Sequence, residues 1–203
     1  MSGSINAYVE AVAHRTRAAA FRQANGAEIS ADGALAAVLG LMRQSHAARA
    51  RVWIIGNGGS AAIASHMAND LTKNGGIRAS AISDAAMLTC LANDFGYEQV
   101  FARALAFQAG PKDGLIAISS SGNSANILNA VAQARQLGCW IFTLSGFHEA
   151  NKLRGLGDYN AHVASANYGT VELAHLILLH ALLDLAMGWR PDAPDATLAA
   201  AHG

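Results

Sequence analysis

Two polar loops in this sequence contain the residue types that hold a phosphate group. One is the run from Gly56 to Ser60 (GNGGS), and the other is the run from Ser119 to Ser124, which contains four serines. Each follows an apolar run and precedes a helical stretch, so each offers backbone amides at a helix N-terminus, where an anion is favoured. Neither loop contains Lys or Arg. Hydroxyl and amide groups of this kind suit a phosphate monoester held by hydrogen bonds.

Four titratable residues form a second candidate site. His66 and Asp70 are four residues apart in one predicted helix and therefore share a face. Glu172 and His180 are eight residues apart in the last predicted helix, two turns apart on related faces. A carboxylate with a neutral imidazole can move protons in carbon-bound hydroxyl chemistry, and the same four side chains could hold a divalent metal. His175, in the same helix, is interpreted as a structural residue.

The elements that must position these residues alternate between strand and helix from residue 51 onward. The predicted strands cover 51–55, 77–82, 114–118, 139–144 and 159–163, and the predicted helices cover 61–73, 85–92, 97–108, 125–137 and 171–187. This alternation predicts an α/β fold with a parallel sheet and helices on both faces. Ligands of such sheets bind beyond the carboxyl ends of the strands, which is where both polar loops fall.

The chain is predicted to divide into three parts. Residues 1–50 form an N-terminal helical oligomerisation segment, with helices over 5–23 and 31–49. Residues 51–188 form the ligand-binding domain, and residues 189–203, rich in Pro, Asp and Ala, form a flexible tail.

Composition narrows the classes of partner. Lys plus Arg and Asp plus Glu both number 14, so the balanced charge gives no general attraction to nucleic acid or to an anionic membrane, and neither is expected as a partner. Hydrophobic residues make up 52% and charged residues 14%, which excludes a disordered chain and predicts surface buried against other subunits. Cys90 and Cys139 have no metal-ligand spacing and are interpreted as reduced thiols. The first residues lack a signal-peptide pattern, and the apolar stretch 173–189 is too short to span a bilayer, so we expect a cytoplasmic protein.

Two other interpretations of the first loop carry less weight. Gly56 to Ala61 fits the loose G-x-G-x-x-A form of a dinucleotide-binding turn, with Asp84 near the place of its acidic partner, but this leaves the serine-rich loop unexplained. A hydrolase with Ser60 as nucleophile is disfavoured, because GNGGS is not the G-x-S-x-G pattern.

Four motifs, in this order along the chain, resemble those of the SIS (sugar isomerase) domain family, and within it those of the phosphoheptose isomerases. They are GNGGSA at 56–61, His66 within HMAND, NDFGYE at 93–98 and SSSGNS at 119–124. The resemblance runs from about residue 5 to 188. It implies a flavodoxin-like five-stranded parallel sheet and a homotetramer, with a dimer as the alternative, whose active sites use more than one subunit.

The resemblance also implies roles for individual residues. Substrate phosphate would be held by the serine loop, and the sugar would lie against the first loop and the NDFGYE motif: Ser119, Ser120, Ser121 and Ser124 on the phosphate, Asn57, Gly58 and Ser60 beside the sugar, and Asn93 and Asp94 near its hydroxyls. The family's zinc ligands match His66, Asp70, Glu172 and His180, where Asp70 replaces the usual Glu and Glu172 the usual Gln. Asp70 is the first choice as catalytic base and Glu172 the second, with His180 as acid and His66 as an orienting or ligating group.

These expectations combine into one predicted activity. It is a phosphosugar aldose–ketose isomerase that converts sedoheptulose 7-phosphate to D-glycero-D-manno-heptose 7-phosphate through an enediol. The family places such an enzyme in the supply of heptose for lipopolysaccharide biosynthesis. The alternative is a non-catalytic SIS protein that binds a phosphosugar or a replication initiator, and the presence of both His66 and His180 argues against it.

Overall fold

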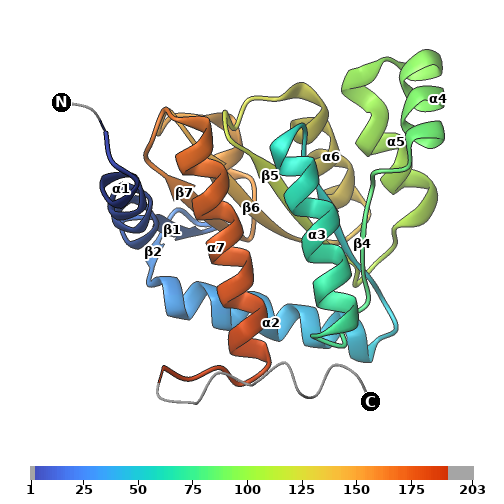
Figure 1. Ribbon diagram of the computed structural model, residues 1–203. Helices are drawn as coiled ribbons and strands as arrows, with labels where there is room; N and C mark the ends of the chain where they lie inside the picture. Colours follow the sequence, from blue (N-terminus) through green and yellow to red (C-terminus); the bar gives the residue numbers. More distant parts are fainter. Residues whose placement is uncertain (1–2, 192–203) are drawn as a thin grey trace.

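A single mixed sheet forms the centre of the molecule in the computed structural model, which describes residues 3–191 (Figure 1). Its seven strands in the described chain are β1 (Ala20–Gln23), β2 (Glu28–Ile29), β3 (Val52–Ile55), β4 (Ala79–Ala81), β5 (Gly114–Ser119), β6 (Trp140–Gly146) and β7 (Tyr159–Val163). They lie in the order β2-β1-β7-β6-β5-β3-β4. The neighbours from β7 to β4 are parallel, and β1 is antiparallel to both β7 and β2.

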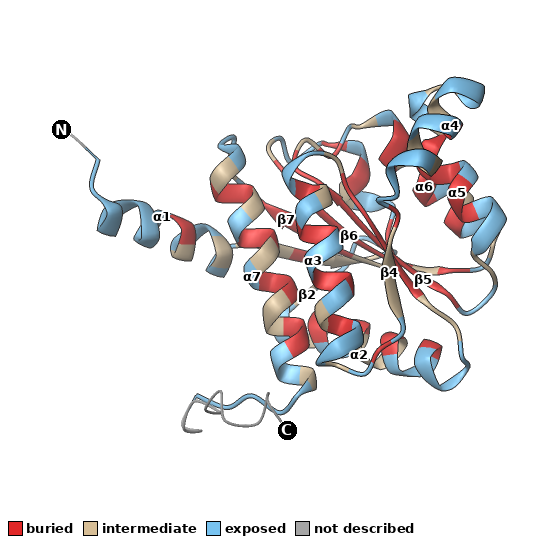
Figure 2. Cartoon of the chain, turned by 45° about the vertical axis from the view of Figure 1, so that its right-hand side comes forward, coloured by how far each residue is buried: buried red, intermediate tan, exposed pale blue. Residues whose placement is uncertain are grey.

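Helices cover both faces of this sheet. They are α2 (Ala31–Ala47), α3 (Gly59–Lys73), α4 (Ala85–Phe95), α5 (Val100–Gln108), α6 (Ala125–Gln136) and α7 (Tyr168–Ala186), with short 3-10 helices η1 (Tyr97–Gln99) and η2 (Lys152–Gly155). Helix α1 (Ile5–Arg17) contacts α7 and extends away from the body of the molecule (Figure 2). One apolar layer joins α2, α3 and α7 to one face of the sheet. A second layer joins α4, α5 and α6 to the other face (Figure 2).

Local sequence explains most of these elements. The central strand β5 is buried along its whole length and is formed by an apolar run, as expected for a parallel strand covered on both faces. Side chains cap several helices: the Ser30 hydroxyl accepts from the Gly33 amide at 3.1 Å, and the Asp84 carboxylate accepts from the Met87 amide at 2.7 Å. Asn167 does the same for α7, which therefore begins at residue 168, three residues before the predicted start.

The predicted α/β architecture and its five parallel strands are confirmed, but the helix predicted over 5–23 is wrong in its last third. That helix ends at Arg17, and β1 and β2 form a hairpin that extends the sheet beyond β7. Phe21 is buried and its neighbour Arg22 is not, and such an alternation of burial along the chain is typical of a β-strand. Asn25 and Gly26 form the turn, where Gly26 has φ +81°. The hairpin belongs to the same sheet as the other strands, and α2 packs in the same core. Residues 192–203 of the predicted tail lie outside the described structure.

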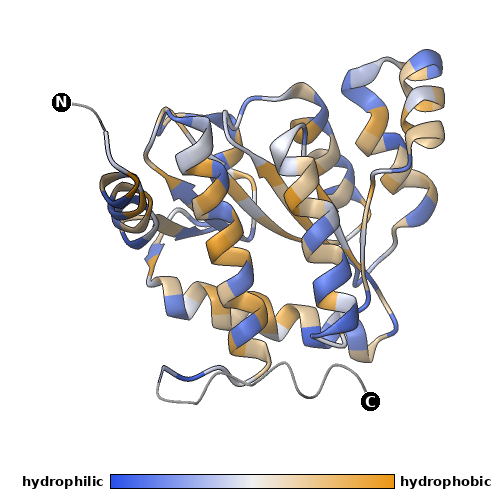
Figure 3. Ribbon diagram, in the orientation of Figure 1, coloured by the Kyte–Doolittle hydropathy of each residue, from blue (hydrophilic) through white to orange (hydrophobic). Residues whose placement is uncertain are grey.

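Helix α7 has 19 residues and, among the described residues, is the one helix long and apolar enough to cross a membrane by length and composition. The expectation that this stretch is too short is therefore wrong. Its inner face, including Val171, Ala174, Leu178 and Leu182, is buried in the core, which is the pattern of a core helix. Its outer face is apolar as well (Figure 3), with Ile177 44% exposed.

Two histidines are buried beside Ser145, His175 on α7 and His162 on β7. His175 on α7 is fully buried, and its Nε2 lies 3.0 Å from the Ser145 carbonyl oxygen. His162 on β7 is 2% exposed, and its Nδ1 lies 3.3 Å from the Ser145 hydroxyl. Burial lowers the pKa of each to about 4, and the positive charge of Arg154 adds to the effect on His162. Both imidazoles are therefore neutral parts of the core, which agrees with the structural interpretation of His175.

The free energy of unfolding should fall as the pH falls from about 6.5 to about 4. In that window the unfolded chain binds protons at these two histidines and the folded chain does not, so each contributes a slope of up to about 1.4 kcal/mol per pH unit. Urea unfolding at pH 7 and pH 5 measures this free energy, and His175→Gln should reduce the difference between the two values. The exposed His46 provides the control, since His46→Gln should leave it unchanged. An equal pH effect in wild type and His175→Gln would contradict the assignment.

Candidate active site

The serine loop joins β5 to α6 at the carboxyl edge of the sheet. The Ser119 hydroxyl accepts from the Gly122 amide at 3.1 Å and lies 3.3 Å from the Ser124 hydroxyl. The Ser120 hydroxyl is buried and has no hydrogen-bond partner within the described structure. Ser124 occupies the N-cap of α6, yet among the described residues its side chain bonds none of the first amides of the helix. The loop therefore has spare hydroxyl and amide donors, which is what an anion needs.

The first loop joins β3 to α3 at the same edge. Its N-cap is Gly58, which has φ +54° and no side chain to cap the helix. Asn57 ties this loop to the other, because its side-chain amide and that of Asn126 exchange two hydrogen bonds of 2.9 Å each. The Tyr97 hydroxyl donates a further 2.9 Å bond to the Asn57 oxygen. The two loops are thus held as one unit.

Both loops and the start of α7 enclose a cavity of about 110 Å³. Its lining combines amide, hydroxyl and carboxylate groups with one apolar side chain and one phenol: Asn57, Ser60, Ile118, Ser119, Ser120, Ser121, Ser124, Tyr168 and Glu172. The structure thus brings together the six predicted residues of the two loops that carry polar side chains. None of the residues named here as lining the cavity is Lys or Arg, so in this part of the structure an anion would be held by neutral donors.

Glu172 lies at the point where α7 meets the start of α3. A methyl group added at Gly59 would overlap the Glu172 carboxylate, so glycine at this position makes room for the acid. The carboxylate lines the cavity, whereas Asp70 is not part of the lining. The structure therefore separates the two predicted candidates for the base.

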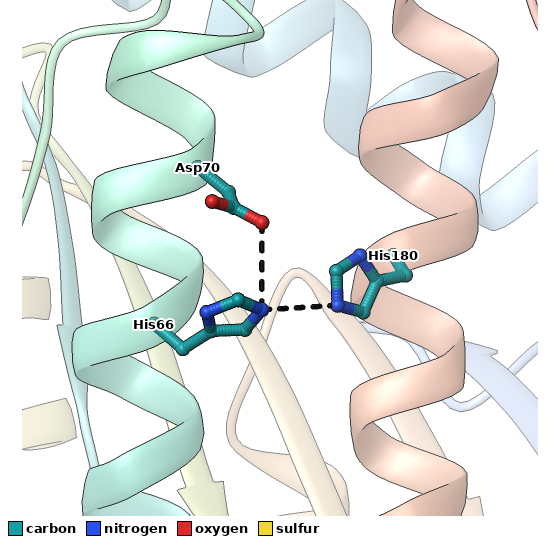
Figure 4. A group of neighbouring side chains, drawn as sticks. All are labelled: His66, Asp70 and His180. Carbon is teal, nitrogen blue, oxygen red and sulfur yellow. Dashed lines mark hydrogen bonds and ion pairs between the residues drawn. The ribbon is translucent and has the colours of Figure 1, made fainter. Parts of the chain in front are cut away.

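His66, Asp70 and His180 form a cluster farther along the same two helices (Figure 4). The His66 Nε2 lies 3.4 Å from an Asp70 carboxylate oxygen and 3.2 Å from the His180 Nε2. One potential ligand atom from each residue lies within 4.8 Å of the others. Two imidazole nitrogens and a carboxylate oxygen suit Zn²⁺ and leave a position for a further ligand. Of the predicted four-residue metal set, three residues meet; Glu172 is eight residues from His180, about 12 Å along α7.

Asn93 and Asp94 lie on α4, outside the cavity lining. Both are exposed, and the Asn93 amide donates to the Asp94 carboxylate at 3.0 Å. Within one chain the structure does not bring them to the other predicted site residues. Sequence reasoning also gave no role to Tyr97, Asn126 and Tyr168, although Tyr97 lies in the NDFGYE motif and Asn126 two residues after Ser124.

Comparison with known proteins assigns the family. Residues 8–146 match the model of the SIS domain. The chain belongs to the SIS domain family. It is 40% identical over 141 residues to the phosphoheptose isomerase of Mycobacterium tuberculosis, covering 66% of this chain and 71% of that protein. A phosphoheptose isomerase of Helicobacter pylori is 39% identical over 140 residues, covering 66% and 72%.

Solved structures agree with this assignment. A phosphoheptose isomerase from Francisella tularensis aligns with a TM-score of 0.76 at 27% identity, covering 91% of this SIS protein and 97% of that chain. The phosphoheptose isomerase of Neisseria gonorrhoeae aligns with a TM-score of 0.71 at 30% identity, covering 75% and 85%. The family predicted from the four motifs is confirmed.

Ser124→Ala should weaken binding of a small phosphate monoester such as glycerol 3-phosphate by about tenfold, because one hydrogen bond to a charged group contributes roughly 1.5 kcal/mol. Isothermal titration calorimetry measures the affinity. Ser83, which is exposed and outside the cavity lining, supplies the control Ser83→Ala. Equal weakening by both variants, or by neither, would contradict a phosphate site in the serine loop.

Proposed function

We propose that this SIS protein is an aldose–ketose isomerase that interconverts sedoheptulose 7-phosphate and D-glycero-D-manno-heptose 7-phosphate. One arrangement carries the proposal: an anion cavity with spare hydroxyl donors and a His/Asp/His cluster lie along the same pair of helices, α3 and α7. The names of the relatives at 37–40% identity support the same reaction class.

The spacing of the two parts suits a long sugar. A chain of seven carbons extends about 8 Å at ordinary bond lengths, and the cluster at His180 lies about 12 Å along α7 from Glu172 at the cavity. With its phosphate in the serine loop, the sugar lies between α3 and α7. Its carbonyl end then lies between the Glu172 carboxylate and the cluster.

The reaction needs two proton transfers. A base removes the proton from the hydroxyl-bearing carbon beside the carbonyl, and an acid protonates the carbonyl oxygen, which gives an enediol. Return of a proton to the former carbonyl carbon, with loss of the proton from the other hydroxyl oxygen, gives the isomer. We assign the acid to His180 through its Nδ1, because its Nε2 is the nitrogen that faces the cluster. Of the two carboxylates, Asp70 lies 3.4 Å from His66, while Glu172 faces the cavity. This favours Glu172 as the base.

A zinc ion is part of the proposal, with His66, Asp70 and His180 as its ligands. When bound, it would polarise the carbonyl and hydroxyl oxygens of the sugar. Asp70 then holds the ion, and Glu172 is the carboxylate left for proton transfer. His66, in contact with both Asp70 and His180, keeps the cluster together.

Glu172→Gln should lower kcat by about 10² to 10⁴, the usual contribution of a general base, while the affinity for sugar phosphate stays within a few-fold. Asp70→Asn is the matched variant: it should lower zinc content, measured by mass spectrometry of the purified protein, as well as kcat. Full turnover in Glu172→Gln would overturn its role as base. An adaptor protein would bind sugar phosphate without turnover even as wild type.

We also propose a homotetramer, with a dimer as the alternative. The support is a groove of about 590 Å³ along the outer face of α7, where several large apolar side chains are exposed: Leu173, Ile177, Leu185 and Trp189. A neighbouring copy on this face would cover them. Neighbouring copies are also our proposed source of Asn93 and Asp94 for the sugar site. We place the enzyme in the cytoplasm, in the supply of heptose for lipopolysaccharide.

Ile177→Glu should reduce the molar mass in solution, because burying an unpaired carboxylate in an apolar interface costs several kcal/mol. Light scattering coupled to size-exclusion chromatography measures the mass. Leu156 is similarly exposed but lies outside the groove, so Leu156→Glu is the control. A wild-type protein that elutes as a monomer would overturn the proposal.

A further inference from the structure

A second cavity, of about 190 Å³, lies between the β1–β2 hairpin and η2. A single water needs only about 10–15 Å³, so this cavity admits a tetrahedral oxyanion. Residues of both segments line it, and two of them are arginines: Arg22, Gln23, Ala24, Gly26, Glu149, Asn151, Arg154 and Gly155. None of these residues lines the phosphate cavity of the serine loop.

The two arginines have unused hydrogen-bonding capacity. The Nε atoms of Arg22 and Arg154 are both buried, and neither has a hydrogen-bond partner in the described part of the chain. Their ion pairs are long: 3.7 Å from Arg22 to Glu28 and 3.8 Å from Arg154 to Glu149. Both glutamates are 82% exposed, whereas the Arg154 side chain is 12% exposed. The acids are therefore solvated at the rim and the Arg154 guanidinium is inside.

The two arginines repel one another here, and the charges of Glu149 and Glu28 offset part of that repulsion. Burial lowers the pKa of Arg154, and the charge of Arg22 lowers it further. The charges of both arginines also help to lower the pKa of the neighbouring His162. An oxyanion between the guanidinium groups would relieve this repulsion and accept hydrogen bonds from the unused N–H groups. The planar guanidinium of arginine matches the geometry of phosphate and carboxylate oxygens.

The wall of the cavity is held in place by Asn151. Its side-chain amide donates to the Gly146 carbonyl oxygen at 3.0 Å, and its side-chain oxygen accepts from the Arg154 backbone amide at 3.0 Å. The Leu153 amide also donates to the Gly122 carbonyl oxygen of the serine loop at 3.0 Å. A site with fixed walls loses little entropy when a ligand binds.

We propose that the cavity between Arg22 and Arg154 is a second oxyanion site, which binds the phosphate group of a small molecule independently of the serine loop. It is distinct from the site of the proposed reaction and does not rest on that reaction. Inorganic phosphate and the phosphate of a phosphorylated metabolite share the chemistry that Arg22 and Arg154 would recognise.

Isothermal titration of the full-length protein with inorganic phosphate tests the proposal. Wild type should bind two phosphates per chain. Arg154→Gln and Arg22→Gln should each weaken binding of the phosphate between the two arginines at least tenfold and leave the phosphate in the serine loop bound. Ser121→Asp puts a carboxylate in the serine loop. It should lose the phosphate of that loop and keep the phosphate between the two arginines. Repeating the titration with glycerol 3-phosphate shows whether the second site admits an esterified phosphate or only the free ion.

Lys152 supplies the matched control, because it lies on η2 and carries the same charge but does not line the cavity. Lys152→Gln should bind two phosphates as wild type does. Far-ultraviolet circular dichroism and the urea midpoint identify a variant that fails to fold, and Arg22→Gln then decides in place of Arg154→Gln. Retention of both phosphates by folded arginine variants would overturn the proposal. So would a single phosphate per wild-type chain that only Ser121→Asp removes.

Discussion

The site depends on two helices, α3 and α6, that begin at the carboxyl ends of neighbouring parallel strands with their first amides uncapped by side chains. Where Ser30, Asp84 and Asn167 cap other helices, α3 begins at Gly58 and α6 at an unbonded Ser124 side chain. An uncapped helix start costs of the order of 1 kcal/mol. Two such uncapped starts follow the adjacent strands β3 and β5. An anion placed there would accept hydrogen bonds from the first amides of both helices.

The chemistry depends on how α3 packs beside α7. The lack of a side chain at Gly59 admits Glu172 to the cavity, and farther along the same pair of helices His66 meets His180. One helix pair thus supports both the anion cavity and the cluster. The distance between them is set by helix geometry, because the rise of α7 separates Glu172 from His180.

Much of this was predictable from the sequence for physical reasons that differ by element. Strands such as β3 and β5 are short apolar runs followed by polar loops, and the serine loop follows from its own composition. The hairpin at 20–29 was missed because its first strand is only four residues long and follows a helix directly. Its strand conformation depends on pairing with β7, which local sequence does not reveal. The pairing of His66 with His180 was only a hypothesis, because helical spacing fixes faces within a helix and says nothing about which helices meet. The separation of Glu172 from His180, in contrast, follows from their eight-residue spacing in one helix and was available from the sequence.

Proton NMR of the protein with sedoheptulose 7-phosphate in D₂O is the decisive test of the proposed isomerisation. Isomerisation through an enediol requires a proton to leave the carbon beside the carbonyl, so solvent deuterium is incorporated there. Our account expects new aldose signals with deuterium at that carbon, and a rate that falls when zinc is removed by a chelator. Binding of the sugar without exchange or conversion, with zinc present, would contradict it.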